Sequence, residues 1–375
     1  MISRLIPIIK KEFKQIRRDK RVLAILTLVP AVMLLINGYA MNFDVSHVKM
    51  AVIDQEKSHR SREFINAFVT SGYFEYVEYL ATAEEASKMI DNAKIRVAIV
   101  VPSDFSEKIL SNDVADVQII VDGMDSNTAS TIIAYVQAIT LQYSQKIVLK
   151  NLAMMGKGSY IPIQYETRVW YNPELKSAKF LVPGLIGFIL AITAVIATSL
   201  SIVREKERNT IEQIDVSPVR PVELILGKMI PYALISLVAA ALVITAAYIM
   251  FDVVVKGSFI YLFGATLLFI CAALSIGLFI STIADSQQVA FQLASISSMV
   301  PTIILSGFVF PIHSMPWWLQ VLSNITPAKF YLVILRSIVL KGVGISAFWD
   351  QICYLLIFIS ILLLISIKRF KKTIG

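Results

Sequence analysis

Few histidines and cysteines, the side chains most used in metal and thiol chemistry, occur in this 375-residue chain. It has three histidines, His47, His59 and His313, and two cysteines, Cys271 and Cys353. Both cysteines lie in apolar runs, so they do not indicate a disulfide framework. These residue types predict neither a metal centre nor a thiol active site.

Two other features resemble binding motifs, and both are incomplete. Asp122 and Asp125 could begin a cation loop, but no regularly spaced oxygen ligands follow, so we interpret this segment as a solvated turn. Gly227-Lys228 lacks the glycine five positions earlier that a phosphate-binding loop needs, because Val222 stands there. The sequence therefore predicts no metal, cofactor or catalytic residue in this chain, and no energy source of its own.

The most informative polar segment is the charged stretch 204–228. Thr210 and Gln213 have the spacing of a helical capping box. Pro218 would end that short helix and Pro221 can begin the next. Short helices of mixed charge are suited to docking in a groove on a partner protein. The alternative is a solvated loop between two membrane spans.

The elements around this stretch are hydrophobic enough to cross a membrane. The chain is 56% hydrophobic and 17% charged, against about 25% charged in soluble domains. Six segments approach the roughly 20 apolar residues of a span, and none contains an ionisable side chain. They are residues 22–41, 180–203, 229–250, 259–282, 289–310 and 351–367.

The basic residues predict the orientation of these spans. Lysines and arginines gather before the first span, between the second and third, and after the last. By the positive-inside rule both termini and the stretch 204–228 are cytoplasmic. The net charge of +8 thus indicates membrane topology rather than nucleic-acid binding. The leader 1–21 carries Ile6, Ile9, Phe13 and Ile16 at helical spacing, which predicts an amphipathic helix at the lipid surface. The alternative is a plain topogenic charge cluster.

Residues 44–178, after the first span at 22–43, form a more polar insert. Its short apolar runs alternate with helical patterns, which predicts a small α/β domain. The strands expected are 48–54, 74–80, 95–101, 117–121 and 165–171, and the helices 63–70, 82–90, 103–110 and about 129–152. The fold class is therefore an α-helical polytopic membrane protein of six transmembrane helices, with an inserted extracytoplasmic α/β domain containing a small mixed sheet.

The stretch 204–228 resembles the signature of ABC type-2 transporter permeases, roughly R-E-x-E-x-G-T-x-E-x-x-x-x-[ST]-P followed by x-x-x-E-x-x-x-G-K. Asn209 replaces the usual glycine and can still adopt a left-handed turn. Further similarity covers most of the chain, including 11–13 with Arg18, 171–173, 182–184, 306–311 and 327–336. The large insert resembles that of bacterial permeases that export drugs or other amphipathic molecules.

This resemblance implies a permease subunit of an ATP-driven exporter in the bacterial inner membrane. Two copies would pair as a homodimer or heterodimer, each on a separate ATPase subunit that holds ATP and Mg²⁺. A periplasmic membrane-fusion adaptor could also take part. The leader residues implied to touch the ATPase are Lys11, Glu12, Phe13 and Arg18. The coupling residues are Arg204, Glu205, Glu207, Arg208, Asn209, Thr210, Glu212, Ser217, Pro218, Glu223 and Lys228.

Residues 311–348 are too apolar for a water-exposed loop and predict two short re-entrant helices. They would act as an outer gate or as a simple anchor, and Arg336 would reach lipid headgroups or pair with another group. The gate residues are Phe310, Pro311, Trp317, Trp318 and Arg336.

Cargo contacts would come from polar and adaptable side chains on the spans, although most hydroxyls there are expected to bond to their own helices. The candidate pathway residues are Phe188, Thr193, Phe291, Ser295, Ser298 and Met299.

Two other classes of function are weighed against the permease. A membrane-bound sensor could use the α/β domain to bind a ligand, but only about 25 residues lie between spans two and three, too few for a large output domain. A membrane-embedded enzyme would need clustered catalytic groups, and the sequence contains none.

Overall fold

The computed structural model describes residues 2–40, 47–111, 113–154, 170–172, 176–208 and 220–374. The chain forms two compact units. Met1–Asn42 and Arg168–Gly375 make the helical unit, and Phe43–Thr167 make the sheet unit. This division agrees with the predicted insertion of an α/β domain after the first span.

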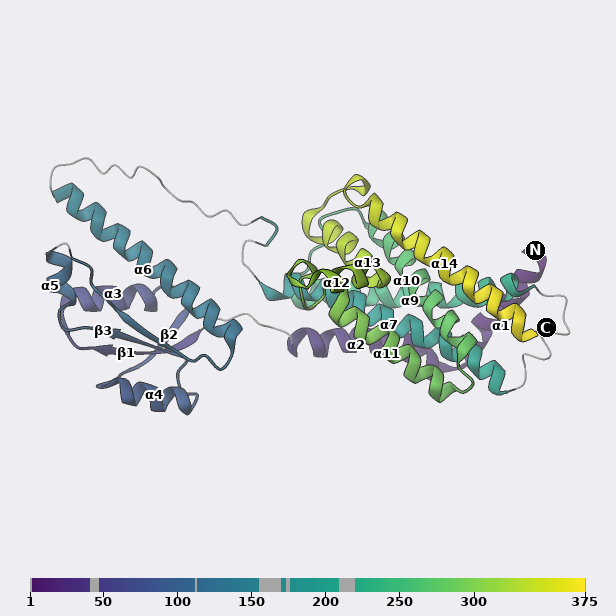
Figure 1. Ribbon diagram of the computed structural model, residues 1–375, viewed down its shortest axis with the longest axis horizontal. Helices are drawn as coiled ribbons and strands as arrows, with labels where there is room; N and C mark the ends of the chain where they lie inside the picture. The colour runs from purple at the N-terminus through teal and green to yellow at the C-terminus, as the bar shows by residue number, and fades with distance from the viewer. Residues whose placement is uncertain are drawn as a thin grey trace. The chain divides into compact units, whose positions relative to one another are not determined.

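Six helices of the helical unit are long and apolar enough to cross a membrane, which confirms the predicted number of spans (Figure 1). A shorter helix, α1 (Ile2–Arg18), precedes them at the predicted leader. The six are α2 (Lys20–Ala40), α7 (Ser177–Glu207), α9 (Pro221–Phe251), α10 (Phe259–Ile283), α11 (Gln287–Leu305) and α14 (Trp349–Ile374).

Several boundaries differ from the sequence prediction, and two of these differences have a local physical cause. The leader ends at Arg18 rather than at residue 21, and α2 begins at Lys20, because lysine and arginine are good helix formers and extend the span beyond its apolar part. The fifth span ends at Leu305 rather than at residue 310. Gly307 has φ +79°, a left-handed conformation that turns the chain out of the helix.

Helix α7 lies at the centre of the helical unit and packs against α2, α9, α10 and α11. Close approach of α10 depends on Gly277, where an added Cβ would lie only 2.4 Å from the carbonyl oxygen of Val195 on α7. Small residues at such crossings allow membrane helices to pack backbone against backbone. The small residue at this crossing therefore allows α10 to pack tightly against α7.

Residues 311–348, here called the hairpin segment, contain the two short helices expected, α12 (Trp317–Leu322) and α13 (Pro327–Arg336). Short 3-10 turns at Ile312–Ser314, Ser323–Ile325 and Ile345–Ala347 and a π-helical turn at Ser337–Lys341 connect them to the bundle. Helix α13 is largely buried, since its Tyr331 stacks on Phe269 of α10 with ring centroids 4.2 Å apart. Helix α13 is thus packed on protein, whereas α12 has no buried residue.

The sheet unit has a four-stranded mixed sheet in the order β2-β1-β3-β4 among the described residues. β1 is parallel to both β2 and β3, and β4 is antiparallel to β3. The strands are β1 (Val48–Asp54), β2 (Phe74–Tyr79), β3 (Val97–Val101) and β4 (Gln118–Val121). The fifth strand, expected at 165–171, lies mostly outside the described residues, and its described end, Trp170 and Tyr171, is not in a strand.

Alternating side chains of the central strands supply two cores. Val48, Met50 and Val52 face α3 (His59–Val69), α5 (Phe105–Leu110) and α6 (Ser126–Met154). Ala51 and Ile53 face α4 (Ala83–Asp91) on the other side of the sheet (Figure 1). Thr82 caps α4 by accepting a hydrogen bond from the Glu85 N–H, as its spacing predicted.

Candidate functional site

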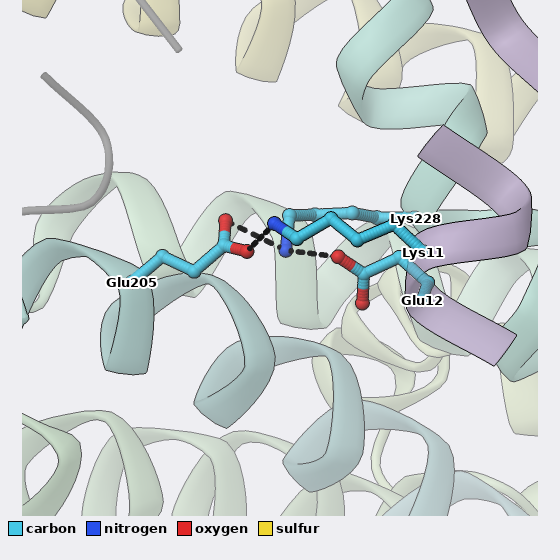
Figure 2. Close-up of polar contacts among 4 residues, drawn as sticks. All are labelled: Lys11, Glu12, Glu205 and Lys228. Carbon is cyan, nitrogen blue, oxygen red and sulfur yellow. Dashed lines mark hydrogen bonds and ion pairs between the residues drawn. The ribbon is translucent and has the colours of Figure 1, made fainter. Parts of the chain in front are cut away.

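Four charged side chains from three helices meet at one end of the helical unit (Figure 2). Lys11 and Glu12 come from α1, Glu205 from the last turn of α7 and Lys228 from the second turn of α9. We call these four residues the charged cluster. Because α7 ends at residue 207 and α9 begins at 221, the cluster joins the leader to both flanks of the predicted coupling stretch.

Lys228 is the centre of the charged cluster. Its Nζ lies 3.1 Å from Glu12 Oε1 and 2.8 Å from Glu205 Oε2, and the side chains of Lys228 and Glu12 are only 2% exposed. Lys11 Nζ lies 2.9 Å from Glu205 Oε1 at the exposed edge of the cluster. Such charges are costly to bury unless opposite charges lie close by. Two carboxylates and two ammonium groups therefore balance each other here.

The residue before Lys228 allows the helices to approach closely enough for these contacts. A Cβ added at Gly227 would lie 2.6 Å from Ile8 Cγ2 on α1. Ile8 is one helical turn before Glu12, so both residues lie on the same face of α1. Gly227 and Lys228 thus act together, one by leaving room for α1 and the other by pairing with it.

The remaining charges at the end of α7 bind the turn that connects α10 to α11. Glu207 accepts hydrogen bonds from the backbone N–H and the side-chain amide of Gln287, the first at 2.6 Å. Arg204 Nε donates to Gln287 Oε1 at 3.4 Å, and Lys206 Nζ donates to the Ser281 carbonyl at 2.6 Å. Both flanks of the coupling stretch are therefore held by helices of the same chain.

On the other flank of the coupling stretch, Glu223 stabilises the start of α9. Its buried carboxylate accepts the backbone N–H of Arg220 at 3.0 Å, which caps the first turn of α9. Arg208, by contrast, is exposed at the end of α7. On α1, Phe13 and Arg18 are also exposed. The predicted coupling residues Asn209, Thr210, Glu212, Ser217 and Pro218 lie outside the described residues.

Sequence reasoning singled out all four members of the charged cluster, but it did not predict that they pair with one another. It assigned Lys11 and Glu12 to the leader and Glu205 and Lys228 to the coupling stretch, as contacts of another subunit. The one available signal was that isolated acidic and basic residues, such as Glu12 and Lys228, stand within otherwise apolar helical faces. Whether these residues also contact an ATPase stays a prediction.

At the opposite end of α7, Arg336 holds the hairpin segment in place. Its guanidinium donates to the Gly307 carbonyl at 3.0 Å and to the Phe180 carbonyl at 3.2 Å, and lies 4.0 Å from the centre of the Phe180 ring. Of the two expectations for Arg336, the structure therefore shows bonds to other groups of the protein. Phe310, Trp317 and Trp318 are largely exposed, and Pro311 precedes the first 3-10 turn.

The candidate pathway residues do not form one group. Phe188 is buried and stacks on Phe308, whereas Phe291 and Met299 are exposed. Thr193 donates to the Ile189 carbonyl of its own helix at 2.8 Å. Ser295 and Ser298 lie on α11, and of the six only Ser298 lines a cavity of about 380 Å³ between α7, α10, α11, α13 and α14.

In the described part of the chain, no group of three or more histidine, cysteine or acidic side chains could hold a metal ion. Asp122 instead pairs with Arg96 at 2.5 Å, and its other oxygen accepts the Met124 N–H at 3.0 Å. The charged cluster itself offers charge pairing that links α1, α7 and α9.

Comparison with known proteins agrees with this architecture. A family model described as ABC-2 family transporter protein matches residues 20–368. The chain is 30% identical to the probable multidrug ABC transporter permease YbhR of Escherichia coli (strain K12), with 95% of each chain covered. It is 33% identical to the probable multidrug ABC transporter permease YbhS of the same strain, over 88% of this chain and 87% of the relative.

A third similar protein of that strain, the inner membrane transport permease YhhJ, is 27% identical over 97% of this chain and 96% of its own length. The family match takes in the sheet unit and runs from α2 into α14. The chain belongs to the ABC-2 family of transporter proteins and is a multi-pass membrane subunit of an ABC transporter.

Proposed function

We propose that this protein is the permease of an ATP-driven exporter that moves an amphipathic small molecule, drug or lipid-like cargo out of the cytoplasm or inner leaflet. The bacterial inner membrane would be its location, in keeping with the names of its relatives. Each of these relatives is named a permease, which favours transport over the alternative of a ligand sensor.

The proposed orientation has both termini in the cytoplasm and the sheet unit on the opposite side of the membrane. Three facts support it. Helix α1, the end of α14 and both flanks of the coupling stretch lie at the same end of the helical unit (Figure 1). Basic residues concentrate at these positions. The exposed face of α1 carries Lys10, Lys14 and Arg17, which would be attracted to anionic lipid on the cytoplasmic surface.

The charged cluster carries the proposal. Separate ATPase subunits, which would bind ATP and Mg²⁺, would contact the coupling stretch between α7 and α9. Because Lys228 and Glu205 stand at its two flanks and Lys228 also pairs with Glu12, a displacement of either flank would move α1 as well. An ATPase movement would thus reach three helices together rather than one loop alone.

The proposed assembly contains a second permease copy, with cargo passing between the two, and leaves room for a periplasmic membrane-fusion adaptor. In this proposal the chain itself holds no cofactor. The energy of transport would come entirely from the ATPase subunits.

Co-purification with a co-expressed ATPase subunit tests the proposal. Replacing both Arg204 and Glu212 with alanine should uncouple the pair, so that ATP-dependent dye movement in reconstituted vesicles is lost and ATP hydrolysis by the pair changes. Glu84→Ala with Lys88→Ala on the exposed face of α4 is the matched control and should have no effect. Normal hydrolysis and transport in the Arg204 and Glu212 double variant would refute coupling through this stretch.

A further inference from the structure

A cavity within the helical unit has no place in the coupling function described above. It has a volume of about 380 Å³, within the range of roughly 300–1,000 Å³ typical of small-molecule sites. Helices α7, α10, α11 and α14, the end of α12, and the start of α13 with the turn before it form its walls.

Most of the cavity wall is apolar, and none of its lining residues carries a charge. Phe269 and Ala273 lie on the α10 side and Phe358 on the α14 side. A charged group placed there would lose its hydration without gaining an opposite charge. The wall therefore favours a neutral, lipophilic occupant.

Two buried hydroxyls on this wall lack hydrogen-bond partners among the described residues. Thr302 of α11 is 3% exposed and Thr326, which precedes α13, is 4% exposed. Hydroxyls in membrane helices usually bond to a carbonyl of their own helix, as those of Thr193 and Ser298 do here. Thr302 makes no such bond, and Thr326 makes no capping bond to α13. Both residues line the cavity, so their hydroxyls are available to an occupant.

The same part of α11 also offers an acceptor. Pro301 lines the cavity and has no N–H, so it cannot donate to the carbonyl of Ser297 one turn earlier. Ser297 also lines the cavity. A ligand hydroxyl could therefore donate to this carbonyl and accept from Thr302, which a ligand without an O–H could not reproduce.

We propose that this cavity binds a neutral lipophilic alcohol taken from the bilayer. The apolar part of the ligand would lie against α10 and α14, and its hydroxyl group would bond to Thr302 and the neighbouring carbonyl. Leu322 and Ile325 line the cavity and are 43% and 66% exposed, so they mark its opening. Binding needs no ATPase; only the further step, that this ligand is cargo, rests on the proposed function.

Photolabelling of the purified full-length chain in lipid nanodiscs tests the site. The probes are a long-chain alcohol with a diazirine in its alkyl chain and the methyl ether of the same molecule. We expect the alcohol to label peptides that contain 301–305 and 322–328, and the ether to label them less. Thr302→Val keeps the side-chain volume and should reduce labelling by the alcohol by about tenfold, while labelling by the ether is unchanged.

A second pair of variants tests the opening of the cavity and does not depend on Thr302. Leu322→Trp should obstruct the opening and reduce labelling by both probes, whereas Val321→Trp, at an exposed position on the same helix that does not line the cavity, should leave it unchanged. Equal labelling by alcohol and ether, or labelling of these peptides that neither Thr302→Val nor Leu322→Trp reduces, would overturn the proposal. Because the ATPase is absent, either result is separate from a failure of the coupling mechanism.

Discussion

The two ends of α7 each hold a cation from another part of the chain, but they compensate its charge differently. Near the end of α7 at Glu205, Lys228 is 2% exposed and lies between two carboxylates from two other helices. Near the beginning of α7, Arg336 is half-buried and bonds to two backbone carbonyls and stacks on one ring. The first contact balances full charges, whereas the second uses only dipoles and a ring face.

This difference has a mechanical consequence. Removing Lys228 would leave two buried carboxylates close together, which is energetically costly. Separating α1, α7 and α9 would break the same charge pairs, so these three helices are held together as one unit. Removing Arg336 would take a hydrogen-bond donor from the Gly307 and Phe180 carbonyls, but it would leave no charged group without its partner. We therefore expect the end with the charged cluster to move as a block and the end with the hairpin segment to rearrange more easily.

The largest effect is expected for Lys228→Met. It leaves the buried Glu12 without a cation and Glu205 with only the half-exposed Lys11, which should destabilise the protein by about 3–5 kcal/mol. The change would be measured as a lower midpoint of thermal unfolding in detergent. Adding Glu12→Gln to this variant should recover part of the loss, because one uncompensated charge is removed. If the double variant is no more stable than Lys228→Met, the charges are not coupled.

Gly227→Ala should have the next largest effect. The new methyl group would lie within 2.6 Å of Ile8 Cγ2 and push α1 away from α9, at a cost of about 1–3 kcal/mol. The midpoint of thermal unfolding again gives the measurement. Ile8→Ala removes Cγ2, the nearest obstructing atom, and leaves Cβ at 2.9 Å. The pair Gly227→Ala with Ile8→Ala should therefore be more stable than the sum of the single changes predicts. Strict additivity would contradict the close approach.

Arg336→Met should destabilise the protein less than Lys228→Met, by about 1–3 kcal/mol, because two carbonyls lose a donor but no charge is stranded. Arg336→Lys should recover little, since an ammonium group cannot reproduce the forked contact or the stacking on Phe180. Both variants would be compared by thermal unfolding. A loss as large as that of Lys228→Met would remove the contrast between the two ends.

The smallest effect is expected for Lys11→Ala. Lys11 is 53% exposed in its pair with Glu205, and exposed pairs contribute about 0.2–1 kcal/mol. The effect should shrink further in high salt, whereas that of Lys228→Met should change little because burial limits screening. Unfolding midpoints at low and high salt measure both. A salt-insensitive loss of several kcal/mol for Lys11→Ala would show that the edge of the cluster is as buried in solution as its centre.

Much of the fold followed from local patterns. The six spans were visible because each is a long apolar run, and β1 matched its prediction at both ends because a short apolar run lay between polar segments. The end of α11 was placed five residues too late, since residues 306–310 are as apolar as the helix before them. Only the conformation of Gly307 distinguishes the turn from the helix.

The residues of the candidate site could be predicted from the sequence, but their contacts with one another could not. The motif similarity pointed to Glu205, Gly227 and Lys228 and to the leader, but it assigned them to contacts with another subunit. Their mutual pairing could not be predicted, because Lys228 and Glu12 are more than 200 positions apart in sequence. The partners of Arg336 could not be predicted for the same reason, because they too are remote in sequence.

The sequence by itself determined which segments are helical and apolar, where the α/β insert interrupts them, and on which flanks the charges stand, since these depend on the composition and periodicity of neighbouring residues. The tertiary structure alone decided which charges neutralise one another, why a glycine precedes Lys228, and that Thr302 faces a cavity rather than its own helix. These outcomes depend on the distance between helices that are remote in sequence, and that distance is set by packing.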